Sequence, residues 1–171
     1  MATSAVSRFW GKYQEKSGKS LSLLAHSLDV AVVFRALCDL NGMRRSLGNS
    51  TETTLTDEHL DRLAVLAMLH DIGKANLGFQ DKILQRRPTH AGHIRELAPL
   101  FADEDLRNML LDSLPRDIVT WFSGVASADS YFFAIFSHHG RPVRFLETKS
   151  GNYWLARDEW WRPDALRNPS Q

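Results

Sequence analysis

A histidine and an aspartate stand side by side, as His70-Asp71, at the end of an apolar helical run. Adjacent residues of a helix do not share a face, so both side chains can reach one ligand only where the helix ends or distorts. Gly73 and Gly78 follow closely and favour such an ending. The pair therefore requires a break in the helix, and it places two ligand-type side chains at that break.

The rest of the chain is predicted to be helical. Apolar residues recur at helical spacing and β-branched alternation is almost absent, so we predict an all-α fold. Ser20 is the expected N-cap of a helix that ends near Leu40, and Thr56 is the expected N-cap of a second helix that ends at the histidine–aspartate pair. The polar stretches 1–19 and 43–55 are predicted to be non-helical. Further helices are expected over 78–85, 90–101, 103–113 and 117–138, the last ending at Gly140.

Length and charge limit the possible classes of protein. The chain has 171 residues and is expected to form one domain, residues 1–171. A net charge of +1 gives no overall case for nucleic-acid binding, so any such interaction needs a local patch. Neither an apolar run of about 18 residues nor a charged leader is present, so we expect no membrane partner and a cytoplasmic location. The local basic clusters are Lys82 with Arg86 and Arg87, and Arg141 with Arg144.

The single cysteine and the histidines indicate the kind of chemistry. Cys38 excludes an internal disulfide and is predicted to be a small buried side chain. Imidazole nitrogens and carboxylate oxygens suit Mn, Fe, Co, Ni or Zn, and an open site of this kind activates a bound water for attack at phosphorus. A lone histidine is usually a surface residue, and His59 beside a helix start is assigned to that class. The other histidines form the candidate metal site: His26, His70, His90, His93, His138 and His139.

Several local sequences resemble a known family. The order of His26, His70-Asp71, His93 and His138-His139 along the chain resembles the HD superfamily of metal-dependent phosphohydrolases. More narrowly, the local sequences resemble the HD nuclease domain of CRISPR type I interference, closest to the subtype I-E branch. The similarity covers about residues 8–145 and implies an HD-domain helical bundle with a metal site at the helix ends. The matching segments are Phe9-Trp-Gly-Lys12, His26-Ser-Leu-Asp-Val-Ala31, His70-Asp-Ile-Gly-Lys-Ala-Asn-Leu-Gly-Phe-Gln80, Ala91-Gly-His-Ile94 and Ser137-His-His-Gly140.

The resemblance implies a metal-dependent endo- or exonuclease that hydrolyses phosphodiester bonds of single-stranded DNA with metal-activated water. One or two divalent transition-metal ions, Mn, Co, Ni or Fe, are implied, with Mg as an alternative. Asp71 is implied to bridge two metal positions. The first position would be held by His26, His70 and Asp71, and the second by Asp71, His93, His138 and His139.

Two further assignments are considered with the same resemblance. His93 is preferred to His90 as a ligand because Gly-His-Ile is the family-like context, whereas His90 follows a Pro-Thr loop. Lys74 is implied to face substrate phosphate or to support the site, although a lysine at a helix end is often only a solvated cation. Asp71 and Lys74 are thus the predicted catalytic residues.

The family context also implies partners. The domain usually precedes a helicase on one polypeptide, so single-stranded DNA, a helicase domain or subunit, and the CRISPR surveillance complex are expected partners. This chain lacks the Gly-x-x-x-x-Gly-Lys-Ser/Thr loop of ATPases. The family's first metal position normally receives a late aspartate, and Asp158 and Asp164 come too early to supply it. The chain is interpreted as a nuclease domain truncated at its C-terminus, an excised piece of a larger protein, or a divergent short member.

Two alternatives remain open from the sequence. One is an HD phosphohydrolase that acts on small nucleotides, which the core motif would serve equally well. The other is a catalytically weak metal-binding fragment that docks onto a CRISPR complex or a helicase through an aromatic tail. For that tail we favour packing on the core over docking. Its tryptophans are Trp154, Trp160 and Trp161.

Overall fold

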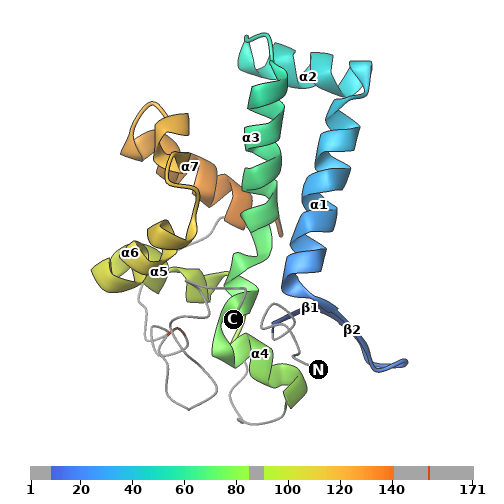
Figure 1. The fold of residues 1–171 in the computed structure, drawn as a ribbon, viewed down its shortest axis with the longest axis vertical. Helices are drawn as coiled ribbons and strands as arrows, with labels where there is room; N and C mark the ends of the chain where they lie inside the picture. Colours follow the sequence, from blue (N-terminus) through green and yellow to red (C-terminus); the bar gives the residue numbers. More distant parts are fainter. Residues whose placement is uncertain (1–8, 85–90, 141–153, 155–171) are drawn as a thin grey trace.

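Two long helices run side by side through the domain and a third crosses their ends (Figure 1). The computed structural model describes residues 9–84, 91–140 and 154. The long helices are α1 (Leu23–Cys38) and α3 (Asp57–Met68), and α2 (Asn41–Thr51) connects them. The remaining helical segments are η2 (Leu69–Ala75), α4 (Leu77–Leu84), η3 (Arg95–Leu97), α5 (Pro99–Ala102), α6 (Glu104–Ser113), η4 (Ile118–Trp121) and α7 (Val125–Phe136).

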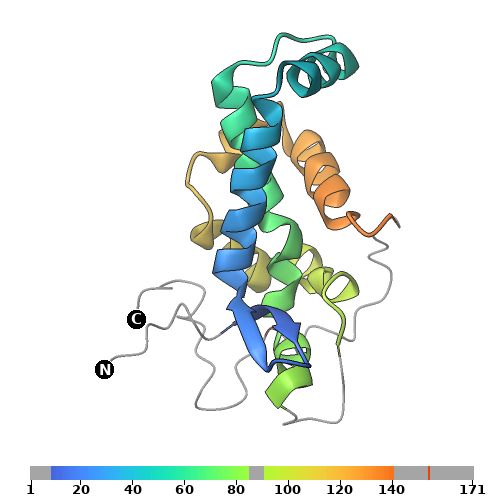
Figure 2. The same ribbon diagram turned by 90° about the vertical axis from the view of Figure 1, so that its right-hand side faces the viewer.

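A small β-hairpin lies at the foot of α1 (Figure 2). Its antiparallel strands are β1 (Trp10–Gln14) and β2 (Lys19–Ser22), and Gly18 adopts a φ of +65° in the turn between them. The described part of residues 1–19 is non-helical, as predicted, but the hairpin itself was not predicted. The predicted N-cap is wrong by two residues, because Ser20 belongs to β2. Ser22 caps α1 instead, and its hydroxyl accepts a hydrogen bond from the Ala25 amide at 3.1 Å.

The start of α3 was predicted correctly. Thr56 is its N-cap and accepts a hydrogen bond from the amide of His59 at 3.2 Å, while the His59 ring accepts one from the amide of Thr56 at 3.3 Å. This reciprocal pair is a capping box with histidine in the place of the usual glutamate. His59 thus stabilises the start of a helix, in agreement with its assignment outside the metal site.

Other predicted elements differ from the observed ones. The stretch 43–55 was expected to be a loop, but most of it belongs to α2. A helix was expected over 90–101, whereas the described residues form the short segments η3 and α5. Pro99 occupies the first turn of α5, where its missing N–H is not needed, rather than ending a helix. The helices predicted near 78–85 and 103–113 correspond to α4 and α6, and the stretch 117–138 is divided into η4 and α7.

The core lies between η2 and the segments that follow it. One cluster of buried side chains contains Leu97, Leu100, Phe136 and Trp154. The Trp154 side chain is 2% exposed and its indole N–H donates to the carbonyl oxygen of Glu96. Packing of this tryptophan on the core is therefore confirmed, while Trp160 and Trp161 lie outside the described residues. Cys38 is buried, as predicted.

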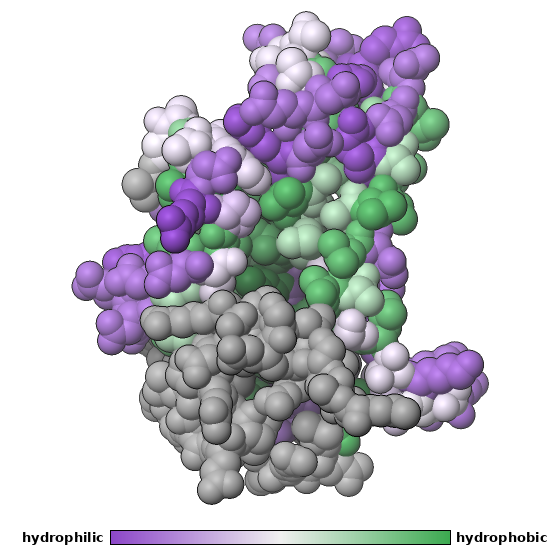
Figure 3. Space-filling model, viewed as in Figure 1, coloured by the Kyte–Doolittle hydropathy of each residue, from purple (hydrophilic) through white to green (hydrophobic). Residues whose placement is uncertain are grey.

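The outer face of α1 is apolar and open. Leu24, Leu28 and Val32 follow one another at intervals of four residues and are 42%, 46% and 66% exposed. Figure 3 shows hydrophobic residues gathered along α1 on this face of the molecule. The opposite side of α1 packs on α3. Among the described helices, none is both long enough and apolar enough to cross a membrane.

Candidate metal centre

The α-helix before the histidine–aspartate pair ends where the sequence predicted a break. α3 stops at Met68 and continues as the 3₁₀-helix η2, which contains both His70 and Asp71. A 3₁₀-helix has about three residues per turn, so its side chains are displaced from their α-helical directions. Both side chains then reach one point, with Nε2 of His70 3.0 Å from Oδ2 of Asp71. Asp71 is buried, at 3% exposure.

One oxygen of Asp71 receives three close contacts. Nε2 of His26, on α1, lies 2.9 Å from Oδ2, and Nε2 of His70 lies at 3.0 Å. The ammonium group of Lys74 is 2.7 Å from the same atom. Side chains from two segments that are distant in the sequence, α1 and η2, thus converge on a single buried carboxylate oxygen.

The other oxygen of Asp71 faces the second set of histidines. Nε2 of His93 lies 3.4 Å from Oδ1, and Nε2 of His138 lies at 3.5 Å. Nε2 of His139 is 2.9 Å from Nε2 of His93. Oδ1 is buried and receives no hydrogen bond from the described part of the chain. A buried carboxylate oxygen left in this way is costly unless a cation satisfies it.

The potential ligand atoms fall into two groups that match the two predicted positions. His26, His70 and Asp71 form one group, and His93, His138 and His139 form the other. Within each group, the ligand atoms lie within 4.8 Å of one another. Asp71 belongs to the first group through its contacts and faces the second through Oδ1, which is the arrangement expected of a bridging carboxylate.

Backbone carbonyls fix the protonation of two of these rings. Nδ1 of His70 lies 2.8 Å from the carbonyl oxygen of Ala67, and Nδ1 of His138 lies 3.0 Å from that of Ile135. A carbonyl oxygen only accepts, so each Nδ1 carries a proton and, in the neutral ring, Nε2 carries a lone pair. Both lone pairs face Asp71. Two acceptors that face one another require a proton or a metal ion between them, so each Nε2 either donates a hydrogen bond to Asp71 or binds a metal.

The electrostatic environment keeps these groups in the protonation states that bind metal. Burial lowers the pKa of His93 to about 4 and also lowers the pKa values of His26 and His138. Burial alone would raise the pKa of Asp71, but hydrogen bonds from His70 and Lys74 outweigh it and hold that pKa well below its usual value. Neutral imidazoles beside an ionised carboxylate are the forms that ligate a divalent cation.

Lys74 is held inside the site rather than extended into solvent. Its ammonium group contacts Asp71 and also donates to the carbonyl oxygen of Gly11 at 3.1 Å. β1 lies close to α1 at Gly11. A β-carbon on Gly11 would stand only 2.8 Å from Cα of Leu23 and 3.1 Å from Cβ of His26. Of the two roles considered for Lys74, these contacts favour support of the carboxylate.

The Asn-Leu-Gly-Phe-Gln stretch after the pair has a structural role that sequence reasoning missed. The Asn76 side chain donates to the carbonyl oxygens of Gly73 and Gly92, and Gln80 bonds both the amide and the carbonyl of Trp10. Gln80 thereby fastens the hairpin beside the metal centre. The Phe9-Trp-Gly-Lys12 segment was the available signal, but nothing in its local pattern pairs Trp10 with a residue seventy positions away.

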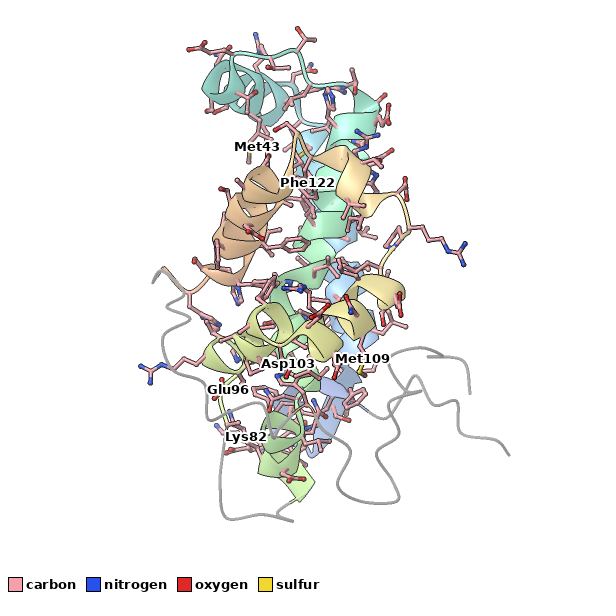
Figure 4. All side chains as sticks on the ribbon, turned by 90° about the vertical axis from the view of Figure 1, so that its left-hand side faces the viewer. Met43, Lys82, Glu96, Asp103, Met109 and Phe122 are labelled. Atoms are coloured by element: carbon pink, nitrogen blue, oxygen red, sulfur yellow. The ribbon has the colours of Figure 1, made fainter. Side chains whose placement is uncertain are left out.

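Some predicted residues are not placed. His90, Arg86, Arg87, Arg141, Arg144, Asp158 and Asp164 lie outside the described residues. Lys82 is described, and its ammonium lies 4.2 Å from the centre of the Phe79 ring. Lys82 and Glu96 are labelled in Figure 4. Within residues 9–84, 91–140 and 154, Asp71 is the sole carboxylate in the two candidate groups.

Comparisons with known proteins identify the family of this chain and a solved structure with a similar fold. The family model described as "Cas3, HD domain" matches residues 10–167. Among solved structures, the chain is similar to the crystal structure of T. fusca Cas3, with 27% sequence identity and a TM-score of 0.52. That match covers 85% of this chain and 16% of the T. fusca chain. A search of curated proteins found no match.

Proposed function

Because the chain belongs to the family of Cas3 HD domains, we propose that it is a metal-dependent nuclease that hydrolyses phosphodiester bonds of single-stranded DNA in CRISPR type I interference. The observation that carries the proposal is the position of Asp71 between two groups of histidines, with a buried oxygen that receives no hydrogen bond from the described residues. The helicase and the surveillance complex are proposed as partners on family membership.

The donor set fits one or two divalent transition-metal ions, such as Mn, Fe, Co or Ni. The proposed ligands are those of the two groups, His26, His70 and Asp71, and His93, His138 and His139. When bound, the ions would polarise a phosphoryl oxygen and activate a water for attack at phosphorus.

The protein's own groups have distinct roles in this proposal. Asp71 would supply a negative charge to both groups of metal ligands, and its burial excludes water that would screen that charge. The carbonyl oxygens of Ala67 and Ile135 orient the rings of His70 and His138 toward the centre. Lys74 balances the charge of Asp71 and keeps it ionised.

Cleavage of labelled single-stranded DNA by the purified 171-residue chain tests the proposal. The assay is run with Mn, Co, Ni, Fe or Mg, and with a chelator. Asp71→Asn is compared with His59→Asn, which alters a histidine at the start of α3 and outside the centre. We expect metal-dependent cleavage that is lost in Asp71→Asn and retained in His59→Asn.

Two other outcomes would contradict the proposal. Cleavage of mononucleotides in preference to DNA would favour the small-nucleotide phosphohydrolase. Tight metal binding with no cleavage of any DNA would favour the catalytically weak fragment whose role is docking.

A further inference from the structure

A pocket of about 600 Å³ opens beside the metal centre, on the surface of the β-hairpin. This volume lies within the usual range of ligand pockets, about 300–1,000 Å³. His93 and Lys74 form part of its wall. His93 belongs to the second candidate ligand group and Lys74 contacts Asp71, so the pocket is continuous with the centre.

The pocket is positively charged. Lys12 and Lys19 lie on the two paired strands and line the pocket. Lys74 lines it too, but its charge is balanced by Asp71. No acidic side chain is among the described residues that line it. The chain as a whole has a net charge of only +1, so this concentration of cations is local. Such a patch is what sequence reasoning required for binding of a polyanion.

The pocket also offers aromatic surface. Trp10 stacks on Phe79 with ring centres 4.6 Å apart, and Phe79 and His93 form a T-shaped pair with ring centres 5.3 Å apart. These rings form a continuous apolar wall that leads from the hairpin to a candidate metal ligand. Tyr13 lines the same pocket and is 40% exposed.

Sites for single-stranded nucleic acid combine cationic side chains that contact the phosphate backbone with exposed aromatic rings that stack on the bases. We propose that the hairpin pocket binds a nucleotide of the single-stranded substrate next to the phosphate that is cleaved. Lys12 and Lys19 contact its phosphates and Tyr13 stacks on its base. The inference rests on the proposed nuclease function and adds to it a substrate-binding site that the predicted basic clusters did not include.

Binding can be measured separately from cleavage. Fluorescence anisotropy of a labelled oligodeoxythymidylate is recorded with the full chain in excess chelator, over a series of salt concentrations. The test variants are Lys12→Ala/Lys19→Ala, Tyr13→Ala and Tyr13→Phe. The controls are Lys16→Ala, a lysine of the same hairpin turn that does not line the pocket, and Tyr131→Ala, a tyrosine of α7 that is 45% exposed.

The proposal predicts a specific pattern. Tyr13→Ala should weaken binding about fivefold or more, as expected for one lost base–aromatic stack, whereas Tyr13→Phe should bind like the unaltered chain. The double lysine variant should weaken binding and reduce the salt dependence of log K by about 1.4, or about 0.7 for each lost phosphate contact. Both controls should bind normally.

Equal affinities for Lys12→Ala/Lys19→Ala and Lys16→Ala would overturn the proposal, as would equal affinities for Tyr13→Ala and Tyr131→Ala. Equally tight binding of duplex DNA would also contradict it, because paired bases cannot stack on Tyr13. Hydrolysis of bis(p-nitrophenyl) phosphate by the unaltered chain reports on the metal centre alone. Absence of that hydrolysis would count against the nuclease function, while the anisotropy result still decides the role of the pocket.

Discussion

The backbone of Gly73 lies directly against the backbone of His93. A β-carbon placed on Gly73 would stand 1.7 Å from the carbonyl oxygen of His93, a distance that no pair of unbonded atoms adopts. The contact joins η2, which carries Asp71, to the segment that carries a histidine of the second ligand group. The glycine therefore does more than end a helix. It allows the two halves of the metal centre to approach each other.

We expect Gly73→Ala to separate these halves. The atom in the way belongs to the backbone, so it cannot move aside as a flexible side chain would, and overpacking of this kind typically costs about 1–3 kcal/mol. The affinity for Mn should fall at least tenfold, measured by titration calorimetry, and the urea midpoint should fall as well.

Gly42→Ala is the matched control, because a β-carbon on Gly42 would meet nothing within 4 Å and the residue lies in α2. It should leave metal affinity unchanged and should stabilise the helix by up to about 1 kcal/mol. If Gly73→Ala binds Mn as tightly as Gly42→Ala does, the close approach to His93 is not needed for the centre.

Local patterns predicted the parts of the site that depend on neighbours in the sequence. The break at His70 and the N-cap at Thr56 follow from short-range rules, and both are observed. The helix α2 was missed because its Ser, Asn and Gly residues have low helix propensity. Its position is set by tertiary contacts, such as those of Arg44 with the carbonyl oxygen of Leu55 and with Asp57.

Contacts between distant residues could not be predicted in this way. The hairpin is held beside the centre by Gln80, and its lysines line the pocket only because of that attachment. Nothing in the local sequence of Lys12 or Lys19 distinguishes them from other surface lysines. The pattern of residues could therefore predict a list of candidate metal ligands, but not the surface that surrounds them.

The choice between the two neighbouring histidines gives a direct test. His93→Ala removes an imidazole that lies 3.4 Å from Asp71 and 2.9 Å from His139, while the backbone contact with Gly73 stays intact. We expect the rate of DNA cleavage to fall at least about tenfold and one metal position to be weakened. His90→Ala should have a smaller effect on both. The reverse order, in rate and in bound metal measured by mass spectrometry, would exchange the two assignments.

Removal of Lys74 should have opposite effects on the metal-free and metal-bound protein. Its ammonium is 2.7 Å from Oδ2 of Asp71, and hydrogen bonds of this charged kind contribute about 1.5–3 kcal/mol. Lys74→Ala should therefore lower the melting temperature in chelator. With Mn present, the increase in melting temperature should be larger than in the unaltered chain, because no ammonium competes for the carboxylate.

Lys16→Ala is the control for this experiment, since Lys16 is exposed in the hairpin turn. It should melt like the unaltered chain in both conditions. An equal effect of Mn on Lys74→Ala and on Lys16→Ala would show that Lys74 and the metal do not share Asp71.

Acid should destabilise the metal-free protein well above the pH at which carboxylates titrate. Burial lowers the pKa of His93 to about 4, against 6.5 for a free histidine, so between these values the unfolded chain binds the proton more readily. The stability contributed by neutral His93 is fully present above pH 6.5 and is lost as the pH falls toward 4. The lowered pKa values of His26 and His138 act in the same direction. The pKa of Asp71 is also lowered, so the stability that ionised Asp71 contributes is lost only below its free pKa of 3.8.

Urea unfolding in chelator at pH 7.5 and at pH 5.0 measures this effect. From His93 alone, the free energy of unfolding should decrease by on the order of 1 kcal/mol between the two conditions. His93→Gln should show a smaller decrease in the free energy of unfolding, because glutamine does not titrate. The stability of this variant at pH 7.5 depends on how well glutamine packs. A free energy of unfolding that stays constant or rises on acidification would mean that the imidazoles are not held neutral by burial. In that case the imidazoles of the metal-free protein would not already be in the neutral form that binds a metal.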